Sequence, residues 1–141
     1  MVLIDVNVLV YAHREDAKRH SEYRTWLENT INGDAPYGVA DLVLSGFLRV
    51  VTHPGIFEVP TAAPDALEFV EGIRNQPNRV SVAPGSRHWK IFTRLCREHG
   101  ARGALVPDCY LAAMAIESGC EWITTDRDFV RFVELKQRHP C

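Results

Sequence analysis

The apolar residues of the chain form short continuous runs that alternate with longer stretches of helical spacing. The runs at Val2–Ile4, Arg79–Val82 and Glu121–Thr125 predict strands, the first buried on both faces. Helices are expected where apolar residues recur every three or four positions, in segments 17–30, 41–52, 65–75, 87–98 and 106–118. Strands that alternate with helices indicate an α/β fold with a parallel sheet.

The same spacing predicts which helical residues face the interior. Leu42, Phe47, Leu67 and Trp89 all fall on apolar faces and are expected to point inward. Segment 106–118 is apolar on nearly every side, which predicts a central, buried helix with Gly119 just after its end.

Length and composition describe one ordinary folded domain that spans residues 1–141. The chain has 141 residues, is 46% hydrophobic and 24% charged, and shows no linker or internal repeat. No apolar run is long enough for a membrane span, and the N-terminus has no signal-peptide pattern, so we expect a cytoplasmic protein. The net charge of −2 argues against a general nucleic-acid coat but leaves room for a local basic surface.

Three acidic residues stand where a parallel α/β sheet gathers its ligands. Asp5 follows the first strand, Asp126 follows the strand at 121–125, and Asp108 begins the apolar helix between them. If the two strands are neighbours, the three carboxylates converge in one cleft. Asp108 could instead only cap its helix, and Asp126 could only shape a turn. Asp5 is harder to explain structurally, because a carboxylate at the end of an apolar strand has a desolvation cost.

Carboxylates held close together favour a hard divalent cation. They repel one another unless a cation neutralises them, and oxygen-only sites suit Mg²⁺ or Mn²⁺. Such an ion can activate water and stabilise charge on a phosphate. The chemistry indicated is metal-dependent hydrolysis of a phosphodiester.

Four segments of the chain resemble the PIN domains, and in particular the VapC toxins of toxin–antitoxin modules. Segment 3–12 is similar to their opening D-x-N motif, 106–115 to their central acidic helix, and 122–129 to their T-x-D-x-D-F segment. The stretch Gly46–Pro54 adds to the likeness, and the segments follow the family's order over nearly the whole chain.

The resemblance implies a three-layer α/β/α domain with a short parallel sheet flanked by helices. It implies an Mg²⁺- or Mn²⁺-dependent endoribonuclease held inactive by a VapB-like antitoxin, and a homodimer. The residues carried over have two roles. Asp5, Asp108 and Asp126 take the catalytic and metal-binding roles, with Asp128 as a fourth metal ligand and Asn7 and Thr124 in support.

One position departs from the family pattern. Many family members carry a Glu in the helix before the F-L-R-V stretch, where this chain has Gly46. Either Asp128 completes the site or the metal has one ligand fewer. A catalytically weak PIN-like binding module that acts through its antitoxin complex is therefore the alternative function. A phosphatase-like hydrolase ranks lower, because Asn7 stands where such enzymes place a second acid.

A basic stripe offers a surface for RNA. Its members recur at helical spacing and could contact phosphates, although a solvated helix face is the ordinary interpretation of such a pattern; they are Arg87, Lys90, Arg94 and Arg97.

Overall fold

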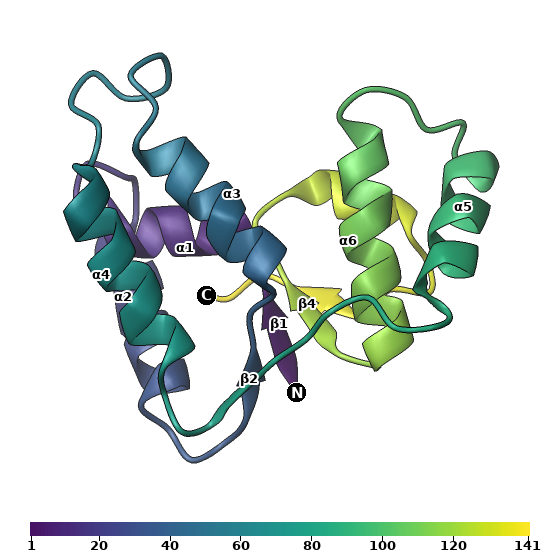
Figure 1. Ribbon diagram of the computed structural model, residues 1–141, viewed down its shortest axis with the longest axis horizontal. Coiled ribbons are helices and arrows are strands. Elements are labelled where there is room, and N and C mark those ends of the chain that lie inside the picture. Colours follow the sequence, from purple (N-terminus) through teal and green to yellow (C-terminus); the bar gives the residue numbers. More distant parts are fainter.

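The computed structural model describes residues 1–141 and contains one parallel sheet between two groups of helices (Figure 1). The sheet has the order β3-β2-β1-β4-β5, and every pair of neighbours is parallel. Its strands are β1 (Val2–Ile4), β2 (Tyr37–Gly38), β3 (Arg79–Val80), β4 (Glu121–Ile123) and β5 (Gln137–Arg138). The predicted three-layer α/β/α architecture is confirmed.

The helices form two lobes on either side of the sheet (Figure 1). The first lobe contains α1 (Val6–His13), α2 (His20–Ile31), α3 (Asp41–Val51) and α4 (Ala63–Arg74). The second lobe contains α5 (His88–Glu98) and α6 (Leu105–Ser118), and the short 3₁₀ helix η1 (Arg127–Arg131) follows β4. Figure 1 shows α3 and α6 on opposite sides of the gap between the lobes.

The strand order creates a switch point at the centre of the sheet. From β1 the chain moves outward through β2 to β3, and it then returns to place β4 on the other side of β1. Val2, Leu3 and Ile4 pair in register with residues 121–123 of β4. The ends of these two strands therefore lie side by side, where parallel sheets gather their ligands.

The core is built around the central strands and the apolar helix α6. Leu3, Ile4, Trp122 and Ile123 have no exposed surface, which fits strands covered on both faces. Helix α6 carries five buried residues and ends at Gly119, whose φ of 68° is the left-handed conformation that glycine adopts readily. The predicted terminal glycine is confirmed, but α6 is buried only in part, because Val106 in its first turn is 36% exposed.

Several local predictions were incomplete or wrong. The apolar stretch after Asp5 forms α1, for which the sequence reading assigned no helix, and the two-residue strands β2 and β5 were not predicted. Leu42, Leu67 and Trp89 were expected to point inward but are 52%, 48% and 67% exposed. Helical spacing shows which residues share a face, but it does not show which parts of that face another element covers.

No helix in the structure is long and apolar enough to cross a membrane.

Candidate active site

Asp5 links the first strand to the first helix and is buried at the switch point. It is the N-cap of α1, where its Oδ1 accepts a hydrogen bond of 2.7 Å from the backbone N–H of Val6. Its Oδ2 accepts a second bond of 2.6 Å from the hydroxyl of Thr124, just beyond β4. Only 5% of the residue is exposed. One carboxylate oxygen is thus fixed by the local cap of α1 and the other by Thr124, which the sheet topology places beside it.

The position of Asp5 disfavours its ionised carboxylate, and its pKa is raised accordingly. The pKa rises from 3.8 to about 6, chiefly because the carboxyl is buried; the hydrogen bonds from Thr124 and Val6 lower it, and the nearby charges of Asp126 and Asp108 add to the rise. A buried carboxylate with like charges around it is typical of a functional site.

Thr124 connects Asp5 to the second acidic segment. Its buried hydroxyl donates to Asp5 and accepts a 3.0 Å hydrogen bond from the backbone N–H of Asp126. Asp126 is in turn the N-cap of η1, where its Oδ1 accepts a 2.8 Å hydrogen bond from the backbone N–H of Asp128. One hydroxyl therefore sets the relative positions of two segments 119 residues apart.

Asp108, Asp126 and Asp128 form a compact acidic cluster. One carboxylate oxygen of each lies within 4.8 Å of the others, and Asp108 comes from the first turn of α6. Burial and the charges of Asp126 and Asp128 raise the pKa of Asp108, while Arg131 opposes the rise. None of the three takes part in an ion pair. A hard divalent cation fits this donor set, because it would neutralise three neighbouring carboxylates that form no ion pair.

The sequence therefore indicated a group of acids that the structure does bring together. Asp108, Asp126 and Asp128 form the cluster, and Asp5 lies close enough for two of them to raise its pKa. Asn7 lies in the first turn of α1, and its side chain makes no hydrogen bond within the chain. The roles assigned to these residues stay predictions.

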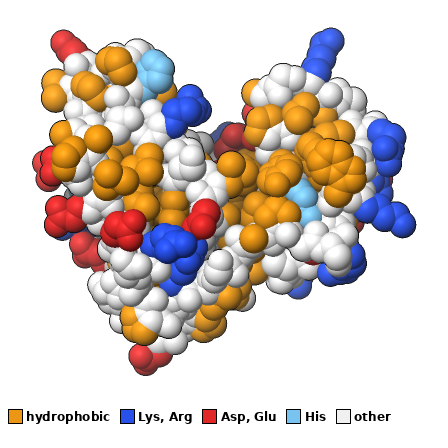
Figure 2. Space-filling model, in the orientation of Figure 1, with side chains coloured by type: hydrophobic (Ala, Val, Ile, Leu, Met, Phe, Trp, Pro, Cys, Tyr) orange, Lys and Arg blue, Asp and Glu red, His pale blue; other side chains and the backbone are white.

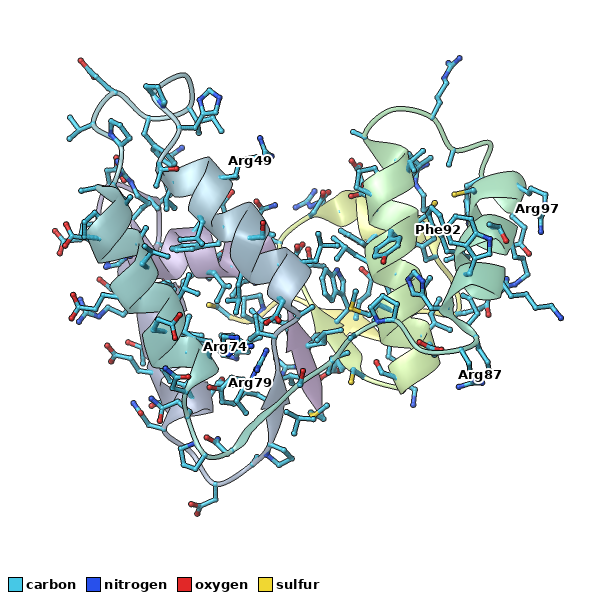
Figure 3. All side chains as sticks on the ribbon, in the orientation of Figure 1. Arg49, Arg74, Arg79, Arg87, Phe92 and Arg97 are labelled. Carbon is cyan, nitrogen blue, oxygen red and sulfur yellow. The ribbon has the colours of Figure 1, made fainter.

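The position of the missing glutamate faces the gap between the lobes. A Cβ atom on Gly46 would lie 3.1 Å from Cγ2 of Val6, the residue after Asp5. Asp41, one and a half turns earlier on α3, does not substitute for it, because its carboxylate pairs with Arg74 at 3.2 Å and Arg79 at 3.1 Å. Figure 3 shows these two arginines together beside β2.

The predicted basic stripe is only partly free. Arg94 pairs with Glu134 at 2.6 Å and with Glu98 at 3.1 Å, and Arg87 donates to the backbone oxygen of Glu117. Lys90 and Arg97 have no ion-pair partner. Figure 3 shows Arg87 and Arg97 on the outer side of α5, directed away from the gap between the lobes. RNA binding by the stripe stays a prediction.

Sequence reasoning missed a groove whose lining includes Val6 and Pro107, the chain neighbours of Asp5 and Asp108. Between α3 and the second lobe lies a space of about 520 Å³ whose lining is mostly apolar and includes Arg49. Figure 2 shows apolar side chains on the second lobe facing this hollow, and Figure 3 shows Arg49 directed into it from α3. No periodicity in the sequence distinguishes Arg49 from the other residues of the stretch Gly46–Pro54.

Comparison with known proteins agrees with this arrangement. The family model described as the PIN domain matches residues 2–135. A VapC ribonuclease of Mycobacterium bovis, Mb2897, is 44% identical over 140 residues, covering 99% of this chain and 95% of its own length. Ribonuclease VapC25 of Mycobacterium tuberculosis is 42% identical, with 99% of each chain covered.

Solved structures give the same result for the fold. VapBC2 from Rickettsia felis, solved with a promoter DNA fragment, matches with a TM-score of 0.69 at 15% identity, over 99% of this chain and 98% of that one. FitAcB from Neisseria gonorrhoeae matches with a TM-score of 0.65 at 15% identity, over 99% and 98%. The order of the acidic segments, the parallel sheet and these likenesses together show that the chain belongs to the PIN domain family, among the VapC ribonucleases.

Proposed function

We propose that this protein is a metal-dependent endoribonuclease toxin whose activity is held in check by a VapB-like antitoxin. The observation that carries the proposal is the acidic cluster at the switch point, where three carboxylate oxygens lie within 4.8 Å of one another and none forms an ion pair. The kinship with named VapC ribonucleases supports RNA as the substrate.

Four carboxylates form the proposed metal site. Asp108, Asp126 and Asp128 would hold Mg²⁺ or Mn²⁺, with the buried Asp5 beside them. When bound, the ion supplies positive charge for the phosphate and lowers the pKa of an attacking water. Thr124 orients Asp5 and the backbone of Asp126, so the donor oxygens are held in place before substrate arrives.

The expected partners are inferred from the same similarity to known proteins. Structural neighbours solved as toxin–antitoxin complexes support an antitoxin partner, and we expect a homodimer. RNA as substrate places the activity in the cytoplasm. Lys90 and Arg97 are the members of the basic stripe that are free to contact phosphates, since Arg87 and Arg94 are already engaged.

The second candidate is a catalytically weak module that acts only through its antitoxin complex. The observation that favours it is Gly46, which brings no carboxylate to the face of α3 nearest Val6. Against it stands the cluster itself, because a site without metal has no reason to hold three mutually repelling acids together.

Cleavage of total RNA distinguishes the two candidates. Purified protein is incubated with RNA in Mg²⁺, in Mn²⁺ and in EDTA, and the fragments are resolved on denaturing gels. We expect fragments only with metal, none with Asp108→Asn, and unchanged cleavage with Asp34→Asn, which alters an exposed acid in the loop after α2. No cleavage with either metal would favour the binding module, and equal cleavage by Asp108→Asn would refute the assigned site.

A further inference from the structure

The two helices of the second lobe bring two cysteines to one interface. Helices α5 and α6 lie side by side (Figure 1), and at their far end the backbone N–H of Arg87 donates to the carboxylate of Glu117 at 2.9 Å. Cys96 lies nine residues after Arg87, and Cys109 lies eight residues before Glu117. The antiparallel register of the two helices therefore places Cys96 opposite Cys109.

The two thiols are in contact at this interface. Cys109 has no exposed surface, and the half-buried Cys96 packs against the same core. The pKa of Cys109 is raised to about 11, first by burial and then by the charge and a hydrogen bond of the Cys96 thiol. Halfway along the same interface the rings of Phe92 and Tyr110 are 5.3 Å apart, so α5 and α6 are closely packed over this whole length. Both cysteines are free, and Cys96 is open to a small reagent.

The pair of thiols adjoins the acidic cluster. Cys109 directly follows Asp108, whose carboxylate oxygen lies within 4.8 Å of those of Asp126 and Asp128. Successive side chains of a helix point about 100° apart, so Cys109 faces α5 while Asp108 faces the other two acids. A movement of the first turn of α6 toward α5 therefore draws Asp108 away from its partners in the cluster.

A disulfide between the two cysteines would produce this movement. The sulfur atoms of a disulfide are about 2.05 Å apart, whereas two unbonded thiols in contact are separated by about 3.5–4 Å. We propose that a hydroperoxide oxidises Cys96 and Cys109 to a disulfide, and that this bond opens the acidic cluster and weakens its binding of metal. Ligands must be held to within about 0.5 Å to keep such a site intact, and the sulfur atoms approach by more than that. The effect on metal rests on the proposed function, whereas the formation of the bond does not.

The oxidation proceeds in two steps, with hydrogen peroxide as the simplest oxidant. The thiolate of the accessible Cys96 attacks one peroxide oxygen and the O–O bond breaks. That oxygen stays on sulfur as a sulfenic acid, and the other leaves as hydroxide, which takes up a proton to give water. The sulfur of Cys109 then attacks the Cys96 sulfur, the S–O bond breaks, and the hydroxyl group leaves as water with the proton of Cys109. Two thiols are oxidised and one peroxide is reduced to two molecules of water.

Counting of thiols and peptide mapping test the bond itself. The full chain in EDTA is treated with excess hydrogen peroxide, unfolded and alkylated with iodoacetamide. We expect two fewer alkylated cysteines than in the untreated protein, and dithiothreitol should restore both. Trypsin releases Cys96 in the peptide 95–97, and Cys109 together with Cys120 in the peptide 103–127. The cross-link between these peptides should persist in Cys120→Ala and disappear in Cys109→Ala.

Metal binding tests the consequence without any measurement of cleavage. After removal of peroxide and EDTA, Mn²⁺ is titrated into the reduced and the oxidised protein by calorimetry. We expect the dissociation constant to rise about 10-fold on oxidation, as when the support of a metal ligand is disturbed. Cys96→Ser treated with the same peroxide is the matched control and should keep the affinity of the reduced protein. By reciprocity, saturating Mn²⁺ should raise the reduction potential of the disulfide by about 30 mV, the equivalent of 10-fold for two electrons.

Each other outcome has a definite meaning. An unchanged thiol count, or a cross-link that survives in Cys109→Ala, overturns the proposal. So does a product of twice the mass as the sole product, if it is absent in Cys141→Ser, because the exposed C-terminal thiol is then the one that reacts. A disulfide that leaves Mn²⁺ affinity unchanged refutes the effect on the cluster. If the bond forms and reverses as expected but neither form binds Mn²⁺, the proposed metal site fails and the disulfide stands.

Discussion

Replacing Asp5 with asparagine should make the metal-free protein more stable while abolishing cleavage. The pKa of Asp5 rises from 3.8 to about 6 in the folded protein. At about 1.4 kcal/mol per pKa unit, the buried charge costs about 3 kcal/mol once the carboxyl is fully ionised. Asparagine has nearly the same shape, carries no charge and can still accept the hydrogen bond from Val6.

The gain should be smaller than this full value. Thr124 now donates to Oδ2 of Asp5 and accepts from the N–H of Asp126. An amide nitrogen in place of Oδ2 leaves the Thr124 hydroxyl without its acceptor, and a buried unpaired donor costs about 1–3 kcal/mol. A net gain of about 1 kcal/mol is therefore expected at pH 7.5 in EDTA. For a chain of this length that corresponds to about 3 °C in the melting temperature.

The pH dependence gives this prediction its direction. Because the pKa of Asp5 in the folded protein lies above its unfolded value of 3.8, the folded state holds the proton more tightly. The cost is absent below about pH 4, grows as the pH rises toward 6 and is complete above it. The advantage of Asp5→Asn should thus appear between pH 4 and 6 and stay constant at higher pH.

The assay is thermal unfolding across this pH range, in EDTA and in Mg²⁺. Metal at ten times its dissociation constant should stabilise the unchanged protein by about 1.4 kcal/mol and the variant by less. The difference between the two melting temperatures should therefore become smaller or change sign. A loss of stability with Asp5→Asn in EDTA at pH 7.5 would refute the argument that burial and like charge strain this carboxylate. Asp34→Asn serves as the control and should show neither effect.

Three other substitutions test the support around the site and the fold. Thr124→Val removes the hydroxyl that lowers the pKa of Asp5, so the acid limb of the pH–activity profile should move to higher pH, whereas Thr124→Ser should leave it in place. Asp128→Asn changes an exposed acid of the cluster and should raise the metal concentration needed for half-maximal cleavage, while the free energy of urea unfolding shifts by less than about 0.5 kcal/mol. Gly119→Ala should cost about 1 kcal/mol in urea unfolding, because φ of 68° strains any residue with a Cβ even where no atom lies nearby.

The sequence was sufficient for the acids but not for all the elements around them. Asp5 was singled out because an acid after an apolar strand is costly, and the structure shows it buried beside the cluster. The same carboxylate also caps α1, and that helix was not predicted because Val6–His13 is too uniformly apolar at its start to show helical spacing. Asp5 was interpreted only as a site residue, although it is also the N-cap of α1.

The elements at the edges of the sheet depend on long-range pairing and not on local pattern. Gln137–Arg138 becomes a strand because Trp122 and Thr124 donate their backbone N–H groups to Lys136 and Arg138. Nothing in two polar residues predicts that pairing. Likewise, the groove lined by Val6 and Pro107 is formed by α3, α5 and α6 together, so no single segment reveals it.

The position of β1 between β2 and β4 has a consequence for the order of events during protein synthesis. Asp5 is synthesised 119 residues before Thr124, whose hydroxyl orients it, and the backbone oxygen that accepts its N–H belongs to Ile123. Until the segment 121–126 has been made, Asp5 has neither contact and the cluster lacks Asp126. The proposed metal site therefore cannot form on a nascent chain until segment 121–126 has been synthesised and has paired with β1.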